Sequence, residues 1–155
     1  MGRVYNVGFH NVSVTAVQDL IAVYAGSTKA FKVHAVSLGQ VTATAVGNLA
    51  ISLRRLTSTV TVGSGGTTPS LLPVGPNDTA ATVTAHANDT TQATTSGAVQ
   101  YMVHDVFNVV NGYLYLPPEE DRITVGPGQA FIVSLDTAPG SAEAMSGWIT
   151  VEELF

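Results

Sequence analysis

Apolar and polar residues alternate with a period of two along most of this chain. The alternation is clearest in Ala81-Thr-Val-Thr-Ala-His-Ala87, and it recurs in Phe31–Leu38, where Phe31, Val33 and Ala35 fall on one face. Successive side chains of a β-strand point to opposite faces, so this pattern predicts strands with one buried face. The 3.6-residue period of an amphipathic helix is almost absent.

We expect about eight strands separated by long loops. Gln18–Tyr24 is compatible with a helical turn or a short strand. The segments predicted to be extended are Val4–Val14, Phe31–Leu38, Leu49–Val62, Ala80–Ala87, Val99–Val109, Tyr113–Leu116, Ile123–Val125, Gln129–Leu135 and Trp148–Leu154.

Two short sequence signals add detail to this prediction, one within Leu49–Val62 and one directly before Tyr113–Leu116. Ile51 and Leu53 should face inward, and the shift of phase at Arg54-Arg55 predicts a β-bulge. Asn111-Gly112 is typical of a hairpin turn.

The strand count predicts an all-β fold. Antiparallel strands in this number and in a chain of 155 residues most often form a sandwich, so we expect an antiparallel β-sandwich, most simply an eight-stranded jelly roll. Residues 1–14 are expected to form an extended N-terminal arm or the first strand, and residues 15–155 a single sandwich domain. As an arm, the N-terminal segment would pair with the sheet edge of a neighbouring subunit.

Only 11% of the residues are charged, against about 25% in an ordinary soluble domain. Thr, Ser, Asn and Gly fill the polar positions instead. Such a surface costs little to desolvate, which suits a protein that packs against neighbours. Between Leu56 and Met102 the only charges are Asp78 and Asp89, so we expect this span to supply the contact surface.

Two loops in that span, Gly63–Pro76 and Asn88–Gly97, are candidates for contact with a partner. Loops of their length are usually functional. The first contains Gly63-Ser-Gly-Gly, which lacks the Gly-Lys-Ser/Thr ending of a phosphate-binding loop. The candidate contact residues are Gly63, Ser64, Gly65, Gly66, Thr67, Thr68, Pro69, Asn88, Asp89, Thr90, Thr91, Thr94 and Thr95.

Composition disfavours several other functions. The net charge of −5 argues against nucleic-acid binding, and the chain has no apolar segment long enough for a membrane helix or a secretory signal. There is no cysteine, and no two of the four histidines lie within four residues of each other. Glu119-Glu120-Asp121 is expected to be a solvated turn rather than a cation site. Without a nucleophile or an acid–base pair, we expect no enzymatic activity, metal or cofactor.

Several stretches taken in order carry a resemblance to a known class of proteins. They are Gln18-Asp-Leu, Lys32–Gln40, Ile51–Pro69, Phe107–Gly112, Pro117-Pro-Glu119 and Gly147–Glu153. This series resembles the small jelly-roll-type virion structural proteins, of the capsid decoration or cement kind, of tailed bacteriophages and prophages. The resemblance implies a homotrimer made in the host cytoplasm and located on the capsid surface. Its partner would be the major capsid protein or another virion protein, and it brings no catalytic motif.

A receptor- or glycan-binding module of a phage head or tail fibre is the alternative function. Tyr101, Tyr113, Tyr115 or Trp148 would then serve as stacking platforms. Saturable binding to bacterial-surface glycans would favour this alternative. An enzyme such as a jelly-roll hydrolase is the third hypothesis, and bound metal in the purified protein would favour it.

Overall fold

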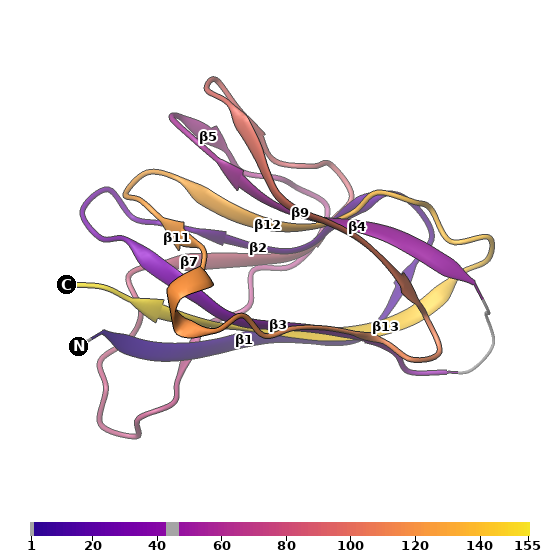
Figure 1. Ribbon diagram of the computed structural model, residues 1–155, viewed down its shortest axis with the longest axis horizontal. Helices are drawn as coiled ribbons and strands as arrows, with labels where there is room; N and C mark the ends of the chain where they lie inside the picture. Colours follow the sequence, from indigo (N-terminus) through magenta and orange to yellow (C-terminus); the bar gives the residue numbers. More distant parts are fainter. Residues whose placement is uncertain (1, 43–46) are drawn as a thin grey trace.

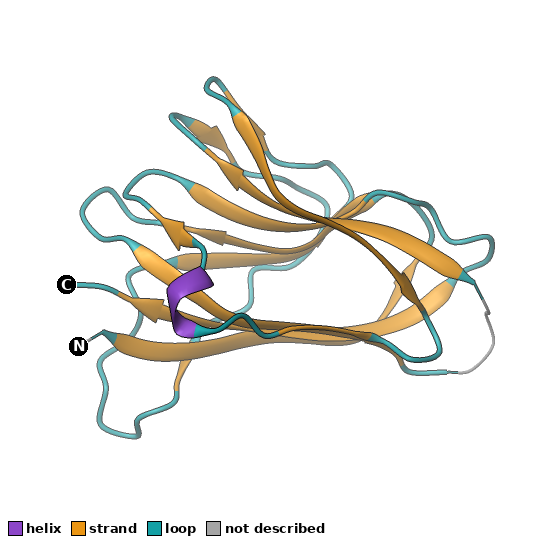
Figure 2. Cartoon of the chain, viewed as in Figure 1, coloured by secondary structure: helices purple, strands orange, loops and turns teal. Residues whose placement is uncertain are grey.

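The computed structural model describes residues 2–42 and 47–155, and these residues form two antiparallel sheets packed face to face (Figures 1 and 2). One sheet has the order β10-β3-β13-β1-β6, with β11 also paired to β3, and the other has the order β7-β2-β12-β4-β9. The elements are β1 (Arg3–Val14), β2 (Gln18–Tyr24), β3 (Phe31–Gln40), β4 (Asn48–Leu56), β5 (Val60–Thr61), β6 (Leu72–Pro73), β7 (Thr84–Asp89), β8 (Thr94–Thr95), β9 (Val99–Asn108), β10 (Tyr113–Tyr115), the 3-10 turn η1 (Glu119–Asp121), β11 (Thr124–Val125), β12 (Ala130–Leu135) and β13 (Glu143–Glu153).

The all-β antiparallel sandwich predicted from the sequence is therefore present. The described residues form 13 strands rather than about eight, because several short strands lie at the edges and outside the main sheets. No helix in the described ranges is long and apolar enough to cross a membrane.

The main core lies between the two sheets, where alternate residues of each strand meet. In β13 the odd positions, including Ile149 and Val151, are fully buried, and the even positions face outward. The strand β12 is buried at every position, which means that its outer face is also covered. The expected bulge in β4 is confirmed, since the β4–β9 register shifts between Leu53 and Arg54.

The N-terminal segment is a strand of the sandwich rather than an arm. β1 pairs with β13 along its length and with β6 on its other side. Tyr5, Val7 and Val14 point into the core, with at most 5% of each residue exposed. Because these side chains complete the core, the segment belongs to the folded domain.

Some element boundaries differ from the expectation. Gln18–Tyr24 is a strand, the long segment expected to reach Val62 ends its main strand at Leu56, and β7 begins at Thr84 instead of Ala80. The turn at Asn111-Gly112 forms, with Gly112 at a φ of 73°, but it is not a hairpin. It joins β9 to β10, which belong to different sheets, so the chain crosses here from one layer to the other.

Candidate functional site

The two loops predicted to contact a partner lie side by side, although the 18 residues 70–87 separate their predicted contact residues in the sequence. β5 pairs with β8 in a small third sheet at the top of Figure 1. Next to it, the backbones of Ser64 and Thr91 exchange two hydrogen bonds of 3.0 Å, and those of Thr67 and Ala87 exchange two of 2.9 Å. We call residues 57–69 and 90–98 together the neutral tip, since no charged residue occurs in either range.

The neutral tip is fixed on the outer face of the β7-β2-β12-β4-β9 sheet by a second hydrophobic cluster. This contact explains why β12 is buried on both faces. The cluster consists of Ala22, Tyr24, Leu56, Ala93, Ala130 and Ile132, with Val60 packed against it.

Beneath the tip, the buried carboxylate of Asp19 in β2 holds the loop that carries β8. Its Oδ2 accepts a hydrogen bond of 2.8 Å from the backbone N–H of Ala93. Its Oδ1 accepts from Arg54 at 2.9 Å and from Gln92 Nε2 at 3.2 Å, and Gln92 also donates to Ser134 at 2.8 Å. Burial raises the pKa of Asp19, while the Ala93 hydrogen bond and the Arg54 charge oppose that rise.

A second buried carboxylate, that of Asp89, holds the other loop. Its Oδ1 accepts from the backbone N–H of Gly66 at 3.2 Å, and its Oδ2 lies 3.0 Å from His86 Nδ1. The ring of Tyr24 meets His86 edge to face at 5.5 Å, and its hydroxyl accepts a 3.4 Å hydrogen bond from Gly63 N–H. Burial raises the pKa of Tyr24 to about 12, so this hydroxyl stays neutral.

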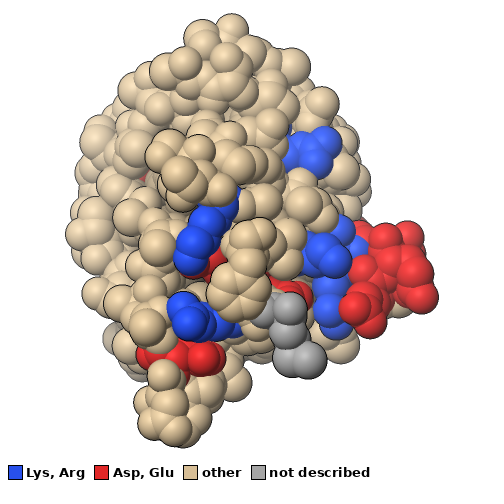
Figure 3. Space-filling model, turned by 90° about the vertical axis from the view of Figure 1, so that its left-hand side faces the viewer, with Lys and Arg blue, Asp and Glu red and all other residues tan. Residues whose placement is uncertain are grey.

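Of the two charged residues in the span between Leu56 and Met102, Asp89 is buried and Asp78 is paired with Arg3. Asp89 is 1% exposed. Asp78 belongs to neither range of the tip, and its carboxylate lies 3.7 Å from Arg3 Nε. In Figure 3 the topmost part of the molecule is tan, and the charged side chains gather below it. The tip therefore presents hydroxyls, glycine backbone and small apolar groups.

The structure divides the predicted contact residues into an exposed and a buried group. Gly63, Asn88 and Asp89 are buried, so they support the loops from below and cannot themselves touch a partner. Asn88 has a φ of 59° and accepts a 3.0 Å hydrogen bond from Gln18. The exposed residues are Ser64, Gly65, Gly66, Thr67, Thr68, Thr90, Thr91 and Thr94, and Pro69 and Thr95 are half-buried.

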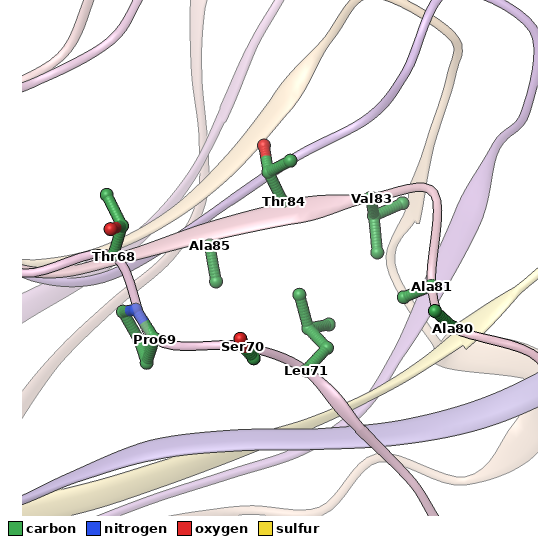
Figure 4. A pocket seen from close by; sticks show the side chains of 9 residues that line it. All are labelled: Thr68, Pro69, Ser70, Leu71, Ala80, Ala81, Val83, Thr84 and Ala85. Carbon is green, nitrogen blue, oxygen red and sulfur yellow. The ribbon is translucent and has the colours of Figure 1, made fainter.

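A hollow of about 290 Å³ opens beside the first loop, between residues 68–71 and residues 80–85 (Figure 4). Its lining consists of small apolar side chains and hydroxyls, such as Ser70, Leu71, Val83 and Ala85. None of the nine described side chains that line it is ionisable. These side chains could bind a ligand of matching shape, but they cannot transfer a proton.

Each of the four histidines contacts a different side chain. His10 contacts Ser146, His34 lies 2.9 Å from Glu152, and His104 stacks on Tyr101 with ring centroids 4.7 Å apart. Within residues 2–42 and 47–155, no group of three or more ionisable ligands could hold a metal ion.

The remaining charged residues of interest are Glu119–Asp121, Arg55 beside the β4 bulge, and Asp105 of β9. Glu119–Asp121 is an exposed 3-10 turn. Arg55 donates to Gln100 Oε1 at 2.8 Å and to the Thr124 carbonyl at 2.7 Å, while Asp105 is exposed.

Sequence reasoning missed the polar network of Asp19, Arg54 and Gln92. One signal was present, because Asp19 stands directly before the apolar run Leu20–Tyr24, where a charge needs a partner. Its partners come from β4 and from the β8 loop, and the sequence does not indicate that these meet.

Comparison of the chain with protein-family models, with curated proteins and with solved structures found no match.

Proposed function

We propose that this protein is a virion structural protein that binds the outside of a phage head as a capsid decoration protein. One observation carries the proposal. The sandwich assembles two separate loops into a fixed tip without charged residues, and the two carboxylates of the same span are buried or paired. Such a surface loses little hydration free energy when it is covered, which favours a protein partner.

The strand order supports assigning the sandwich to the jelly-roll type. Among eight of the strands, β1 pairs with β13, β2 with β12, β3 with β10 and β4 with β9. The first strand thus pairs with the last, the second with the next to last, and so on inward. This is the pairing of one long hairpin rolled into two sheets. On this proposal the remaining strands are additions to the eight.

We assign the contact between subunits of a homotrimer to the free edge of β9. This strand is ten residues long, and in the described chain it pairs only with β4. Val99, Tyr101 and Val106 are 40%, 53% and 61% exposed, and Asp105 is the strand's single charge. Long exposed edges are normally protected by lysines, prolines or a covering segment, and an edge without them pairs readily with another chain.

The mechanism on this proposal is mechanical rather than catalytic. Each subunit would dock its neutral tip on the major capsid protein and contact its neighbours through β9. Several contacts made at once raise the effective affinity and stabilise the shell.

Virus particles test the proposal directly. Antiserum raised against the purified protein should label heads at regular positions in particles from cells that carry the gene. Labelling of tail fibres alone, or no labelling, would contradict a role on the capsid.

Binding of variants to purified phage heads that lack the protein tests whether the neutral tip is the docking surface. Thr67→Lys and Thr94→Lys place charge on the exposed tip and should weaken co-sedimentation with such heads by roughly tenfold. Thr137→Lys, at an exposed loop position outside the tip, is the matched control and should bind like the unmodified protein. Equal binding by all three variants would exclude the tip as the docking surface.

A further inference from the structure

The chain's one tryptophan stands on the outer face of the β10-β3-β13-β1-β6 sheet. Trp148 is 44% exposed, whereas the next residue, Ile149, is fully buried in the core. Its cross-strand neighbours are Gly8 on β1 and Ser37 on β3. Because both neighbours are small, neither can cover the indole ring.

Shallow hollows flank Trp148 on both sides. The larger, about 620 Å³, lies between Trp148 and the segment that carries Asn111 and Leu114, with Ser37 and Gly39 also in its lining. The smaller, about 380 Å³, adjoins Phe9, His10 and Ser146. Among the residues that the structure describes, no Asp, Glu, Lys or Arg lines either hollow.

The glycine at position 39 is not required by the fold. A Cβ at Gly39 would meet no atom within 4 Å, and its φ lies outside the left-handed region. Gly147 differs, because a Cβ there would lie 2.7 Å from a methyl group of Leu38 and 2.9 Å from the Ser37 carbonyl. A glycine inside a strand costs about 0.5–1 kcal/mol relative to alanine. A glycine inside a strand often marks a bulge, a tight bend, or the close approach of a ligand or of another backbone.

We propose that this face binds a neutral saccharide, with one pyranose ring stacked on Trp148. The apolar C–H face of a pyranose matches an exposed indole, and its hydroxyl rim matches the small polar groups around it. Ser37 and Asn111 border the larger hollow. On the other side His10 Nδ1 lies 2.9 Å from Ser146 Oγ, which holds both groups in place. The lack of charged lining residues selects against anionic sugars, which need Arg or Lys partners.

This site is independent of the neutral tip. Trp148 belongs to the sheet that contains β1 and β13, whereas the tip packs on the sheet that contains β2 and β12. Saccharide binding and capsid binding can therefore fail separately.

The single tryptophan makes the site directly observable, because all tryptophan fluorescence of the protein comes from Trp148. Titration of the purified protein with dextran, mannan and galactan should give a saturable change in emission with at least one of them. Gly39→Leu adds a side chain at the lining of the larger hollow, at a position where a Cβ meets no atom within 4 Å, and should weaken that binding by roughly tenfold. Phe155→Ala removes an aromatic residue that is 78% exposed and lines neither hollow, and this variant should bind normally.

Affinity electrophoresis in gels that contain the same polysaccharides extends the test to Trp148→Ala. This variant should lose its retardation while keeping the far-UV circular dichroism spectrum and melting temperature of the unmodified protein. The absence of any saturable response to the three polysaccharides would overturn the proposal, as would unchanged binding by Gly39→Leu. A Trp148 response to phage heads or to protein concentration alone would identify a protein interface instead.

Discussion

Asp19 and Asp89 are direct cross-strand partners on β2 and β7, and each of the two carboxylates holds one loop of the neutral tip. Both residues are only 1% exposed. Buried charges this close together need partners, which Arg54 supplies for Asp19 and His86 for Asp89. The tip has an uncharged outer surface, and buried carboxylates with their hydrogen bonds hold it from below.

Removal of the Asp19 carboxylate should destabilise the whole domain. Asp19→Ala leaves the largely buried Arg54 guanidinium without its counter-charge and the Ala93 N–H without an acceptor. We expect the free energy of unfolding to fall by about 3–5 kcal/mol, measured by urea denaturation. Asp19→Asn keeps an acceptor for Ala93 and should cost less. Equal losses in the two variants would show that the hydrogen bond to Ala93 contributes little.

Removal of the Asp89 carboxylate should act more locally. Asp89→Ala frees the Gly66 N–H and removes the partner of His86, so residues 63–69 should lose protection in hydrogen exchange. The matched control is Asp78→Ala, because Asp78 is the other charge of the span and forms only a partly exposed ion pair with Arg3. Unchanged exchange at residues 63–69 in Asp89→Ala would mean that the backbone pairing alone fixes this loop.

The sequence predicted the sandwich because alternation with a period of two reports directly which face of a strand is buried. The alternation correctly placed Ile51 and Leu53 on the buried face, and its change of phase correctly predicted the bulge that follows them. The pattern does not report partners. Residues 4–14 alternate whether they form a free arm or a strand between β13 and β6, and only the pairing distinguishes these cases.

The positions of the two loops could be predicted from the sequence, but the orientation of their side chains could not. Low charge marked both loops, but composition does not indicate which polar residues point inward. Asn88 and Asp89 look like loop residues, yet they end β7 and lie below the surface, where Gln18 and Gly66 contact them. The Asp19 network depends on contacts between residues far apart in the sequence, and no local pattern encodes such contacts.

Stability should depend on pH through Glu153 near the C-terminus. Burial alone would raise the pKa of this carboxylate, but hydrogen bonds from Lys29 Nζ at 2.8 Å and from Thr82 and Val83 outweigh it and hold the pKa below its usual value. An acid with a lowered pKa in the folded state stabilises the fold above its unfolded pKa, and that contribution is lost as the pH falls through the folded value.

The melting temperature of the unmodified protein should therefore fall between pH 7 and about pH 3, and Glu153→Gln should show a smaller fall. Asp19 acts in the opposite sense, because its raised pKa favours the folded state as the pH decreases. Glu119→Gln, in the exposed turn, is the control and should follow the unmodified protein. A profile of Glu153→Gln parallel to that of the unmodified protein would contradict the role of this carboxylate.

Tyr5 tests whether β1 is part of the folding unit. Its ring is fully buried, and its hydroxyl donates a 2.9 Å hydrogen bond to the Thr79 carbonyl. Tyr5→Ala should lower the free energy of unfolding by about 3–5 kcal/mol, and Tyr5→Phe by about 1 kcal/mol. Deletion of residues 2–12 should abolish the cooperative unfolding transition seen by circular dichroism. A folded deletion variant would restore the interpretation of this segment as an arm.

The free edge of β9 should control self-association. Val106→Lys places a charge on the exposed face of this strand, and a lysine on an edge opposes pairing with a second chain. If the protein forms the proposed homotrimer, this variant should shift the mass measured by light scattering after size-exclusion chromatography from trimer toward monomer. Val74→Lys is the matched control, because Val74 is similarly exposed, at 57% against 61% for Val106, but lies outside β9. If the two variants dissociate alike, the contact lies elsewhere. If the unmodified protein is monomeric at all concentrations, β9 has no role in self-association.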